Sequence, residues 1–516
     1  MAQRFRIWSQ FRAVAIALTL AFALGTAALP ALADETRTPH GDIAGTLRAG
    51  GIDAGLARLV SDLDAPGIAV AVVGPDGIVA EQRAGDLAGA PPTALRWGSL
   101  SKGITGSRVD ALIASGDLRL ADMLGAHVPD LPAGYSEITI RQLLTHTSGL
   151  SHDVALTDVD RPDTSAREVV PELPVHTPAV PHGSAYEYSS LNYLLLQAVV
   201  ESVTGEPFGP PTGVPAHGCS LETENGSVPF FGMLMPAGQR CDSAGLGYGY
   251  FGGTFDELTD WAAWNLSARG RIFHAHSRAA ANPTGADAPA SDTRREAMYG
   301  FGWNYDTVDA GGRTWKRIHH SGAVPGAFTR IEILPDDNRA VVLMASAYGE
   351  PGSADLPEST QFLSSLLAGG QPVPDSGPAE GADAPVYPIA LGALSVLTAG
   401  AGVSLLLQLR GRPRRPVTAL AVSATGSAAM LAGLILGIPA VTGLSVVQLG
   451  RWAPDIVVLA VASTALAVAS AFTALIRWRR SQVSRRTPRR RARGCAPAPV
   501  RHRADRTHRS RRPAGA

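Results

Sequence analysis

Three apolar stretches near the C-terminus constrain the fold of this chain more than any other feature. They span residues 387–407, 417–438 and 456–476, and none of them contains a charged side chain. Each is about 20 residues long, which is the length that crosses the hydrocarbon core of a bilayer. Buried core helices are the alternative, but the lack of charge argues against them. We therefore predict three transmembrane helices within residues 386–477.

Arginine is concentrated beside these stretches. Four arginines lie between residues 410 and 415, and fifteen follow the third stretch, together with a single acid, Asp505. Excess arginine marks cytoplasmic segments. If the N-terminus is exported, three spans place both basic segments inside the cell. We expect residues 478–516 to form a disordered inner tail, although such a tail could also touch anionic lipid or nucleic acid.

The N-terminal residues 1–33 have the pattern of a signal peptide. Arg4, Arg6 and Arg12 precede an apolar stretch over residues 13–24, and the small-residue sequence Ala31-Leu32-Ala33 follows it. An uncleaved anchor helix is the alternative, but the apolar stretch is short. We expect residues 34–368 to form an extracytoplasmic domain that a Gly- and Pro-rich linker, residues 369–385, joins to the cell membrane.

The net charge of zero hides a strong asymmetry along the chain. Residues 34–385 hold 22 basic and 43 acidic residues, which argues against nucleic-acid binding by this part. His319 and His320 are adjacent without Cys or Glu at metal-binding offsets, so we expect no metal and no organic cofactor. Cys219 and Cys241 lie in the exported part and are predicted to form a disulfide, whereas Cys495 lies in the basic tail.

Ser99 and Lys102 form a candidate catalytic pair. The apolar spacing after Gly103 predicts a helix that Ser99 opens, and residues three apart lie on the same face of a helix. A desolvated lysine can take the proton of a serine hydroxyl and make it a nucleophile. Ser-x-x-Lys alone is a weak motif, and a surface lysine is the simpler alternative. However, Lys102 and Lys316 are the only lysines among 45 basic residues, and arginine cannot act as a base.

Two hairpins are predicted at opposite ends of this domain. The apolar run 67–73, the turn 74–77 and the extended segment 78–82 form the first. Residues 328–334, the turn 335–338 and residues 340–345 form the second. We expect these strands to share one antiparallel sheet, with helices at residues 44–63 and 358–367.

Together with Ser99 and Lys102, the phrase Thr145-His146-Thr147-Ser148-Gly149 resembles the serine β-lactamase and penicillin-binding protein family. The resemblance covers roughly residues 44–367 and is to the class C β-lactamase-like branch with D-alanyl-D-alanine carboxypeptidases and D-aminopeptidases. The family's second motif corresponds to Tyr188-Ser189-Ser190, where Ser190 replaces the usual asparagine. Its third motif corresponds to His320-Ser321-Gly322-Ala323.

This resemblance implies an α+β domain of the β-lactamase/transpeptidase type, in which an antiparallel sheet flanked by helices meets an all-helical subdomain. It also implies a serine hydrolase that acts on amide, ester or lactam bonds through an acyl-enzyme. Ser99 would be the nucleophile, and Lys102 and Tyr188 would transfer its proton. Ser190, His320 and Gly322 would line the substrate site, and the amides of Ser99 and Ala323 would form the oxyanion hole. The substrate would be a small molecule or a peptide, with D-alanyl peptides of peptidoglycan as one candidate.

Residues 209–240 depart from the family pattern. The segment is rich in Pro and Gly and has no helical period, so we predict an altered loop or a locally damaged sequence. Together with Ser190, this departure keeps a second hypothesis open, a catalytically impaired receptor that binds penicillin or wall peptide. A transporter or channel is a weaker alternative, because the only acid near the three stretches is Asp455, at an edge.

Overall fold

The structure is a computed structural model. It describes residues 43–271 except 64, 152–155, 158 and 178–180; residue 274; residues 298–349 except 311; and residues 355–368, 386–410, 416–437 and 444–486. The predicted signal peptide, the predicted linker and the tail beyond residue 486 lie outside the described residues. Their predictions are therefore not tested here.

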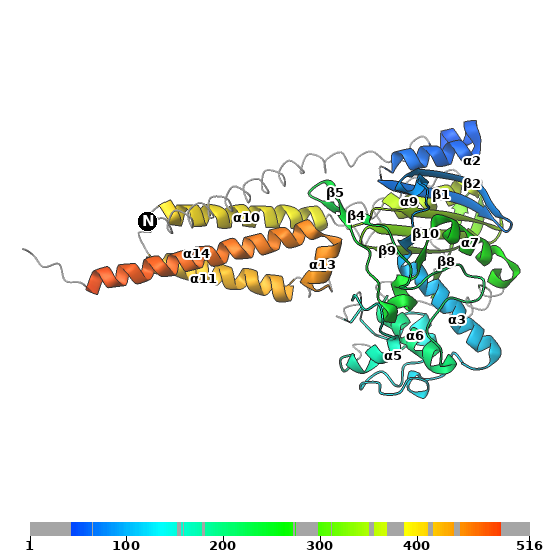
Figure 1. The fold of residues 1–516 in the computed structure, drawn as a ribbon, viewed down its shortest axis with the longest axis horizontal. Coiled ribbons are helices and arrows are strands. Elements are labelled where there is room, and N and C mark those ends of the chain that lie inside the picture. The colour runs from blue at the N-terminus through cyan, green and yellow to red at the C-terminus, as the bar shows by residue number, and fades with distance from the viewer. Residues whose placement is uncertain are drawn as a thin grey trace, which may run out of the picture.

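A seven-stranded antiparallel sheet forms the centre of the N-terminal part, with the strand order β2-β1-β11-β10-β9-β8-β7 (Figure 1). Its strands are β1 (Gly67–Gly74), β2 (Gly77–Gly85), β7 (Met298–Gly300), β8 (Trp303–Ala310), β9 (Arg313–Val324), β10 (Ala327–Leu334) and β11 (Arg339–Ala345). Strands β1 and β11 pair directly, with Ile68 opposite Ala345. The prediction that the two hairpins share one sheet is therefore confirmed.

The sheet is covered on both faces because its central strands are apolar on both faces. Along β1, the side chains of Ala69, Ala71 and Val73 join the main core, whereas Val70 and Val72 join a second cluster. Helices α2 (Ile43–Asp62) and α9 (Asp355–Leu367) contribute Leu56, Leu59 and Leu363 to that second cluster. Helix α7 (Phe255–Leu266) packs on the other face, where Trp261 and Phe255 belong to the main core.

A mostly helical region lies below the sheet in Figure 1. It contains α3 (Ser101–Ser115), α4 (Ile140–Leu144), α5 (Ala166–Val169) and α6 (Ser190–Thr204). Short helical turns connect them: η2 (Asp86–Ala88), η3 (Gly98–Leu100), η4 (Leu124–Ala126), η5 (Val170–Glu172), η6 (Ser243–Gly245) and η7 (Leu246–Tyr250). Strands β3 (Leu95–Arg96) and β6 (Gly252–Gly253) pair beside α3. The predicted combination of an antiparallel sheet, flanking helices and a helical subdomain is confirmed.

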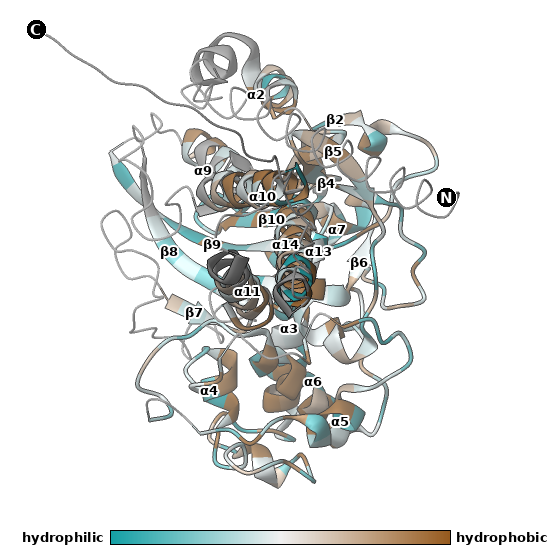
Figure 2. Ribbon diagram, turned by 90° about the vertical axis from the view of Figure 1, so that its left-hand side faces the viewer, coloured by the Kyte–Doolittle hydropathy of each residue, from teal (hydrophilic) through white to brown (hydrophobic). Residues whose placement is uncertain are grey.

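The C-terminal helices extend away from this part as a bundle (Figure 1), which Figure 2 shows end-on. They are α10 (Val386–Arg410), α11 (Pro416–Ala432), which continues into the π-helical turn η8 (Gly433–Gly437), α13 (Val446–Trp452) and α14 (Pro454–Arg486). Two of the described segments, Ala390–Arg410 and Pro454–Val483, are long and apolar enough to cross a membrane, with mean hydropathies of 1.9 and 2.2. The apolar helix between them is shorter, so the second of the three predicted spans stays a prediction.

Within the departing segment, a hairpin joins the N-terminal part to the bundle. Strands β4 (Gly226–Phe230) and β5 (Met233–Ala237) pair with each other, and Phe231 at their turn packs against Leu391 and Ile456 of α10 and α14. The Asp455 carboxylate accepts a hydrogen bond from the Phe231 amide at 3.1 Å and another from the Tyr387 hydroxyl. The segment lacks helix, as predicted, but it forms an ordered hairpin with its own contacts.

Candidate active site

The predicted nucleophile and its predicted base lie within hydrogen-bond distance. Ser99 is in the turn η3, immediately before α3, and Lys102 is in the first turn of α3. The Lys102 Nζ atom donates to Ser99 Oγ at 3.0 Å and to the Tyr248 carbonyl oxygen at 3.0 Å. Lys102 is fully buried, whereas Ser99 is partly exposed. A reactant can therefore reach the hydroxyl from one side, with the amine on the other.

Two close backbone contacts fix Ser99 beside strand β9. Gly98 has a φ of +56°, and a Cβ atom there would lie 2.4 Å from the Ala323 amide nitrogen. A Cβ atom on Gly322 would lie 1.8 Å from the Trp97 carbonyl oxygen. The Thr329 hydroxyl also donates to that oxygen at 2.8 Å. Glycine is needed at both positions because any side chain would separate the two backbones.

The end of β9 presents backbone groups to the site. Strand β8 pairs with β9 only as far as Asn304 opposite His319, so no described strand covers residues 320–324 on that side. This edge is where Ala323 approaches Gly98, next to Ser99. The arrangement brings together the two amides that were predicted to form the oxyanion hole, those of Ser99 and Ala323. Such donors stabilise a transition state only when they point at the developing oxyanion.

Tyr188 enters the site from the segment before α6. Its ring lies 4.8 Å from the Lys102 Nζ atom and 6.2 Å from the His320 ring, measured to ring centroids. Buried His146, from the phrase Thr145–Gly149, supports this segment. Its Nδ1 atom accepts hydrogen bonds from the Ser189 amide at 3.2 Å and from the Asn192 side chain at 2.8 Å. The His146 ring also lies 4.5 Å from the Tyr188 ring. The phrase therefore acts as a scaffold for the second motif.

His320 is buried and neutral. Burial, followed by the nearby charge of Lys102, lowers its pKa to about 3. Its Nδ1 atom lies 2.6 Å from the Ser321 carbonyl oxygen, which can only accept, so Nδ1 carries the proton. The Nε2 atom then accepts from the Tyr299 hydroxyl at 3.4 Å. At neutral pH this histidine therefore presents hydrogen-bonding groups and no positive charge to the site.

Ser190 lies at the start of α6, where its side chain faces the predicted base. The Lys102 Nζ atom is 3.5 Å from Ser190 Oγ, and Ser190 is almost completely buried. The hydroxyl is thus on the lysine side of the site. With it, all seven predicted site residues gather where the sheet meets the helical region: Ser99, Lys102, Tyr188, Ser190, His320, Gly322 and Ala323.

Three residues of the site were given no role in the sequence analysis. Tyr248 supplies a carbonyl oxygen to Lys102, Tyr299 supplies a hydroxyl to His320, and His146 holds the second motif. His146 belongs to the phrase Thr145-His146-Thr147-Ser148-Gly149, on which the family resemblance rests, so its position carried a signal. Tyr248 acts through its backbone, and Tyr299 lies in a short edge strand, so neither has a local pattern that indicates its role.

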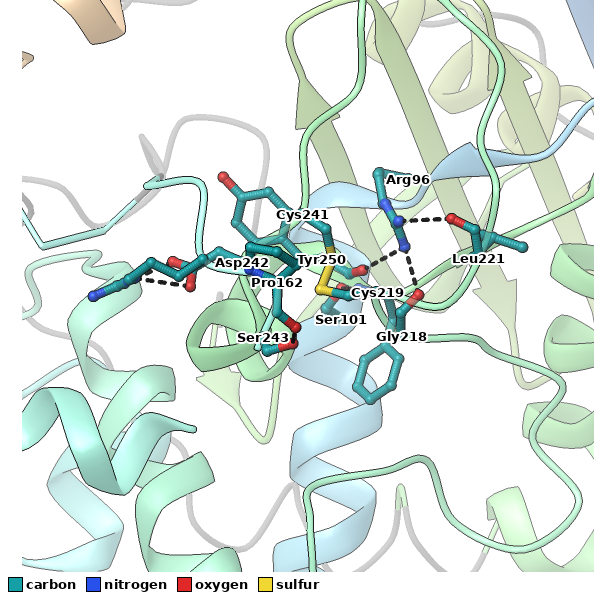
Figure 3. The surroundings of a disulfide bond; sticks show 12 residues. Arg96, Ser101, Pro162, Gly218, Cys219, Leu221, Cys241, Asp242, Ser243 and Tyr250 are labelled. Atoms are coloured by element: carbon teal, nitrogen blue, oxygen red, sulfur yellow. Dashed lines mark hydrogen bonds and ion pairs between the residues drawn. A yellow bond between two sulfur atoms is a disulfide. The ribbon is translucent and has the colours of Figure 1, made fainter. Parts of the chain in front are cut away.

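The predicted disulfide is present behind the site. Cys219 and Cys241 are bonded, with their Cα atoms 5.4 Å apart. Figure 3 shows the bond close to Arg96, whose guanidinium donates to the carbonyl oxygens of Gly218, Leu221 and Tyr250 at 2.8, 3.1 and 3.2 Å. Arg96 and the disulfide together fix the path of the chain between α6 and the hairpin. Arg96 itself lies a few residues before Ser99 in the sequence.

Comparisons with known proteins find similar sequences and structures. Residues 56–210 match the family model described as Beta-lactamase. Protein flp of Staphylococcus aureus (strain MW2) is 32% identical over 127 residues, which cover 23% of this chain and 25% of that protein. The putative penicillin-binding protein PbpX of Bacillus subtilis (strain 168) is 28% identical over 118 residues, which cover 23% of this chain and 29% of that protein. The chain thus spans only about a quarter of the length of these curated relatives.

Among solved structures, a D-stereospecific amidohydrolase from Streptomyces sp. aligns with a TM-score of 0.45 and 18% sequence identity. The alignment covers 60% of this chain and 94% of that chain.

Proposed function

Because the chain belongs to the β-lactamase/transpeptidase-like family, we propose that it is a serine hydrolase that works through an acyl-enzyme at Ser99. The observation that carries this proposal is the 3.0 Å contact between the Lys102 Nζ atom and Ser99 Oγ, with the amine buried and the hydroxyl open to solvent. A nucleophile within hydrogen-bond reach of a base is the arrangement that such chemistry needs.

The reaction has two steps, acylation of Ser99 and hydrolysis of the acyl-enzyme. Ser99 Oγ attacks the carbonyl carbon of an ester, amide or lactam. Its proton passes to the unprotonated amine of Lys102, directly or through the Tyr188 hydroxyl, and then to the leaving oxygen or nitrogen as the bond to carbon breaks. Water then attacks the acyl-enzyme, its proton returns to Ser99 Oγ, and a carboxylic acid leaves. The Ser99 and Ala323 amides would stabilise the oxyanion in both steps. Neutral His320, held by Tyr299, would orient the substrate or Tyr188 as a hydrogen-bonding group.

We further propose that the domain lies outside the cell, tethered by the C-terminal helices, and that its substrates include D-alanyl peptides of peptidoglycan. The two long apolar helices and the arginine clusters support the tether and its direction. The name of PbpX, a putative penicillin-binding protein, supports the substrate class. The hydrolase is expected to act close to the extracytoplasmic surface of the membrane, because the hairpin joins it to the ends of α10 and α14.

Active-site labelling tests the chemistry. A fluorescent penicillin or a fluorophosphonate should label the full chain in detergent at Ser99, and Ser99→Ala should abolish the label while Ser101→Ala retains it. A label mapped to another residue, or one that survives Ser99→Ala, would contradict the proposal.

Turnover separates the hydrolase from a receptor that is only acylated. The replacement of asparagine by Ser190, which lies 3.5 Å from Lys102, is the observation that keeps the receptor in consideration. Repeated turnover of a chromogenic ester or lactam, lost in Ser99→Ala, establishes the hydrolase. A stable adduct at Ser99 without turnover establishes the receptor instead.

A further inference from the structure

A cavity of about 250 Å³ lies between the N-terminal part and the helix α13. Val324 and Pro325 at the end of β9, residues 235–240 after and within β5, and residues 450–452 of α13 contribute to its walls. None of Ser99, Lys102, Tyr188 and His320 lines it. The proposed hydrolase therefore does not account for this space.

The charge of the cavity wall is one-sided. Three arginines line it, Arg96, Arg240 and Arg451, and no aspartate or glutamate is among the described lining residues. Arg240 also pairs at 2.8 Å with the exposed Asp160, at the rim. A concave wall lined by positive charges attracts an anion, and guanidinium groups bind phosphate and carboxylate oxygens well.

Arg96 gives the strongest indication of an anion. It is only 3% exposed, and within the described residues its guanidinium donates to three carbonyl oxygens and to no carboxylate. Burial lowers the pKa of Arg96 to about 10, so the group still carries its charge at neutral pH. A buried charge without a counter-ion is costly, and a bound anion would compensate it.

Two buried donors add to this indication. The Arg96 Nε atom and the Gln239 Nε2 atom make no hydrogen bond within the described part of the chain. The oxygen of Gln239 is already held by the Arg96 amide at 2.7 Å, which leaves its NH₂ group as the available end. Buried donors are normally satisfied, so both atoms point to a missing acceptor.

The position of the cavity identifies the source of the anion. Its floor is the helix α13, which leads into the apolar helix α14, and its wall contains Met235. Met235 and its neighbours Met233 and Leu234 are 38%, 57% and 46% exposed on the hairpin. The turn of the same hairpin packs on α10 and α14, so this apolar strand sits at the helix ends (Figure 1). An amphiphile with an anionic head and apolar chains matches both surfaces.

We propose that this cavity binds the phosphate head of an anionic membrane lipid, whose acyl chains lie along β5 and the ends of α10 and α14. The lipid would compensate Arg96 and would fix the N-terminal part on the bilayer through α13 and the hairpin. The inference rests on the membrane tether of the proposed function and adds a second ligand site to it.

Thermal unfolding of the full chain, purified and delipidated in a neutral detergent, tests the proposal. Short-chain phosphatidylglycerol should raise the Tm in a saturable manner, whereas phosphatidylcholine of the same chain length and inorganic phosphate at matched ionic strength should not. Arg451→Gln and Gln239→Ala should each weaken the apparent affinity for phosphatidylglycerol by about tenfold. Arg339→Gln, a surface change at the far end of the sheet, serves as the matched control and should bind normally.

Several outcomes would overturn the inference. Equal stabilisation by phosphatidylcholine would remove the role of the negative charge, and equal stabilisation by inorganic phosphate would assign the cavity to a soluble anion. Unchanged affinity in the double variant Arg451→Gln/Gln239→Ala would place the lipid elsewhere. If alkaline carbonate extracts the chain from membranes, the proposed membrane tether is wrong. If the chain stays in the membrane but shows no preference among lipids, only the proposed lipid site is wrong.

Discussion

The two faces of strand β9 hold adjacent histidines and buried cations in different surroundings. On one face, His319 lies 3.2 Å from Asp306, and Arg317 pairs with Asp306 at 2.8 Å and with Glu332 at 3.8 Å. On the other face, His320 lies near Tyr299 and Tyr188, and the partners of Lys102 include two hydroxyl groups and a carbonyl oxygen. The first face holds its cations with carboxylates, while the second places an amine against a candidate nucleophile.

This difference teaches which buried charges maintain the fold and which serve chemistry. A buried ion pair between a cation and carboxylates is costly to break, because removing one partner leaves the other charged and without solvent. A buried lysine beside hydroxyls is replaceable in the fold, because neutral partners lose little. The two faces should therefore respond oppositely to the same kind of substitution.

The first prediction concerns the catalytic face. Lys102→Met removes the amine but keeps a side chain of similar length. The rate of Ser99 acylation should fall by about 10²–10⁴-fold, the usual contribution of a general base, while the Tm changes little. Stopped-flow acylation by a chromogenic substrate measures the rate. Lys316→Met, which changes the only other lysine of the chain, at an exposed position, is the control and should react normally. A large loss of stability in Lys102→Met would show instead that Lys102 is a cation that maintains the fold.

The second prediction concerns the opposite face. Arg317→Met leaves Asp306 and Glu332 buried without their shared partner, which should cost about 3–5 kcal/mol of stability. The folded fraction at low temperature should still acylate at Ser99 at a rate close to that of the unchanged protein. Thermal unfolding and labelling on the same samples separate the two effects, with Lys316→Met again as the neighbouring control. A variant that unfolds normally but no longer acylates would remove the distinction between the two faces.

The third prediction uses the pKa values of both histidines. Burial, with the charge of Arg317, lowers the pKa of His319 to about 4, and burial, with the charge of Lys102, lowers that of His320 to about 3. Asp306 and Arg330 also face His319. Both rings are neutral in the fold and titrate near 6.5 when unfolded, so the unfolded chain binds more protons below that pH. Their contribution to stability is complete above about pH 6.5 and is lost toward pH 3–4.

Between pH 7 and pH 5 this loss should be on the order of 2 kcal/mol for each histidine. The Tm of the full chain should therefore fall over this range, and the fall should be smaller in His319→Gln and in His320→Gln, because glutamine does not titrate. Thermal unfolding at several pH values in one buffer series gives the comparison. A Tm that stays constant from pH 7 to pH 5 would show that neither ring is held neutral.

Local patterns predicted much of this arrangement, and distant contacts account for the rest. Apolar runs separated by turns indicated the two hairpins of the shared sheet, and the i to i+3 spacing of Ser99 and Lys102 indicated their contact. Tyr248 and Tyr299 come from segments about 150 and 200 residues away, so no spacing could place them. The hairpin β4–β5 was predicted as a loop, because Pro and Gly interrupt its pattern and its apolar turn is explained only by α10 and α14.

The last prediction concerns Ser190, which lies beside the predicted base. Ser190 Oγ is 3.5 Å from Lys102, at the upper limit of a hydrogen bond, so a longer side chain could both reach the amine and extend toward Ser99. An asparagine amide both donates and accepts, whereas serine carries a single hydroxyl. Ser190→Asn should therefore raise kcat/KM for substrates with an acylamino side chain by about tenfold, which corresponds to one recovered hydrogen bond.

Simple esters lack the acylamino group, so Ser190→Asn should leave their kcat/KM nearly unchanged. Ser190→Ala is the matched control, because it removes the hydroxyl without adding an amide and should not favour acylamino substrates. Steady-state kinetics on paired substrates that share one leaving group and differ only in the acylamino side chain measure the ratio directly. A similar change for both classes would mean that position 190 acts through Lys102 alone, and that the second motif does not contact the substrate at this residue.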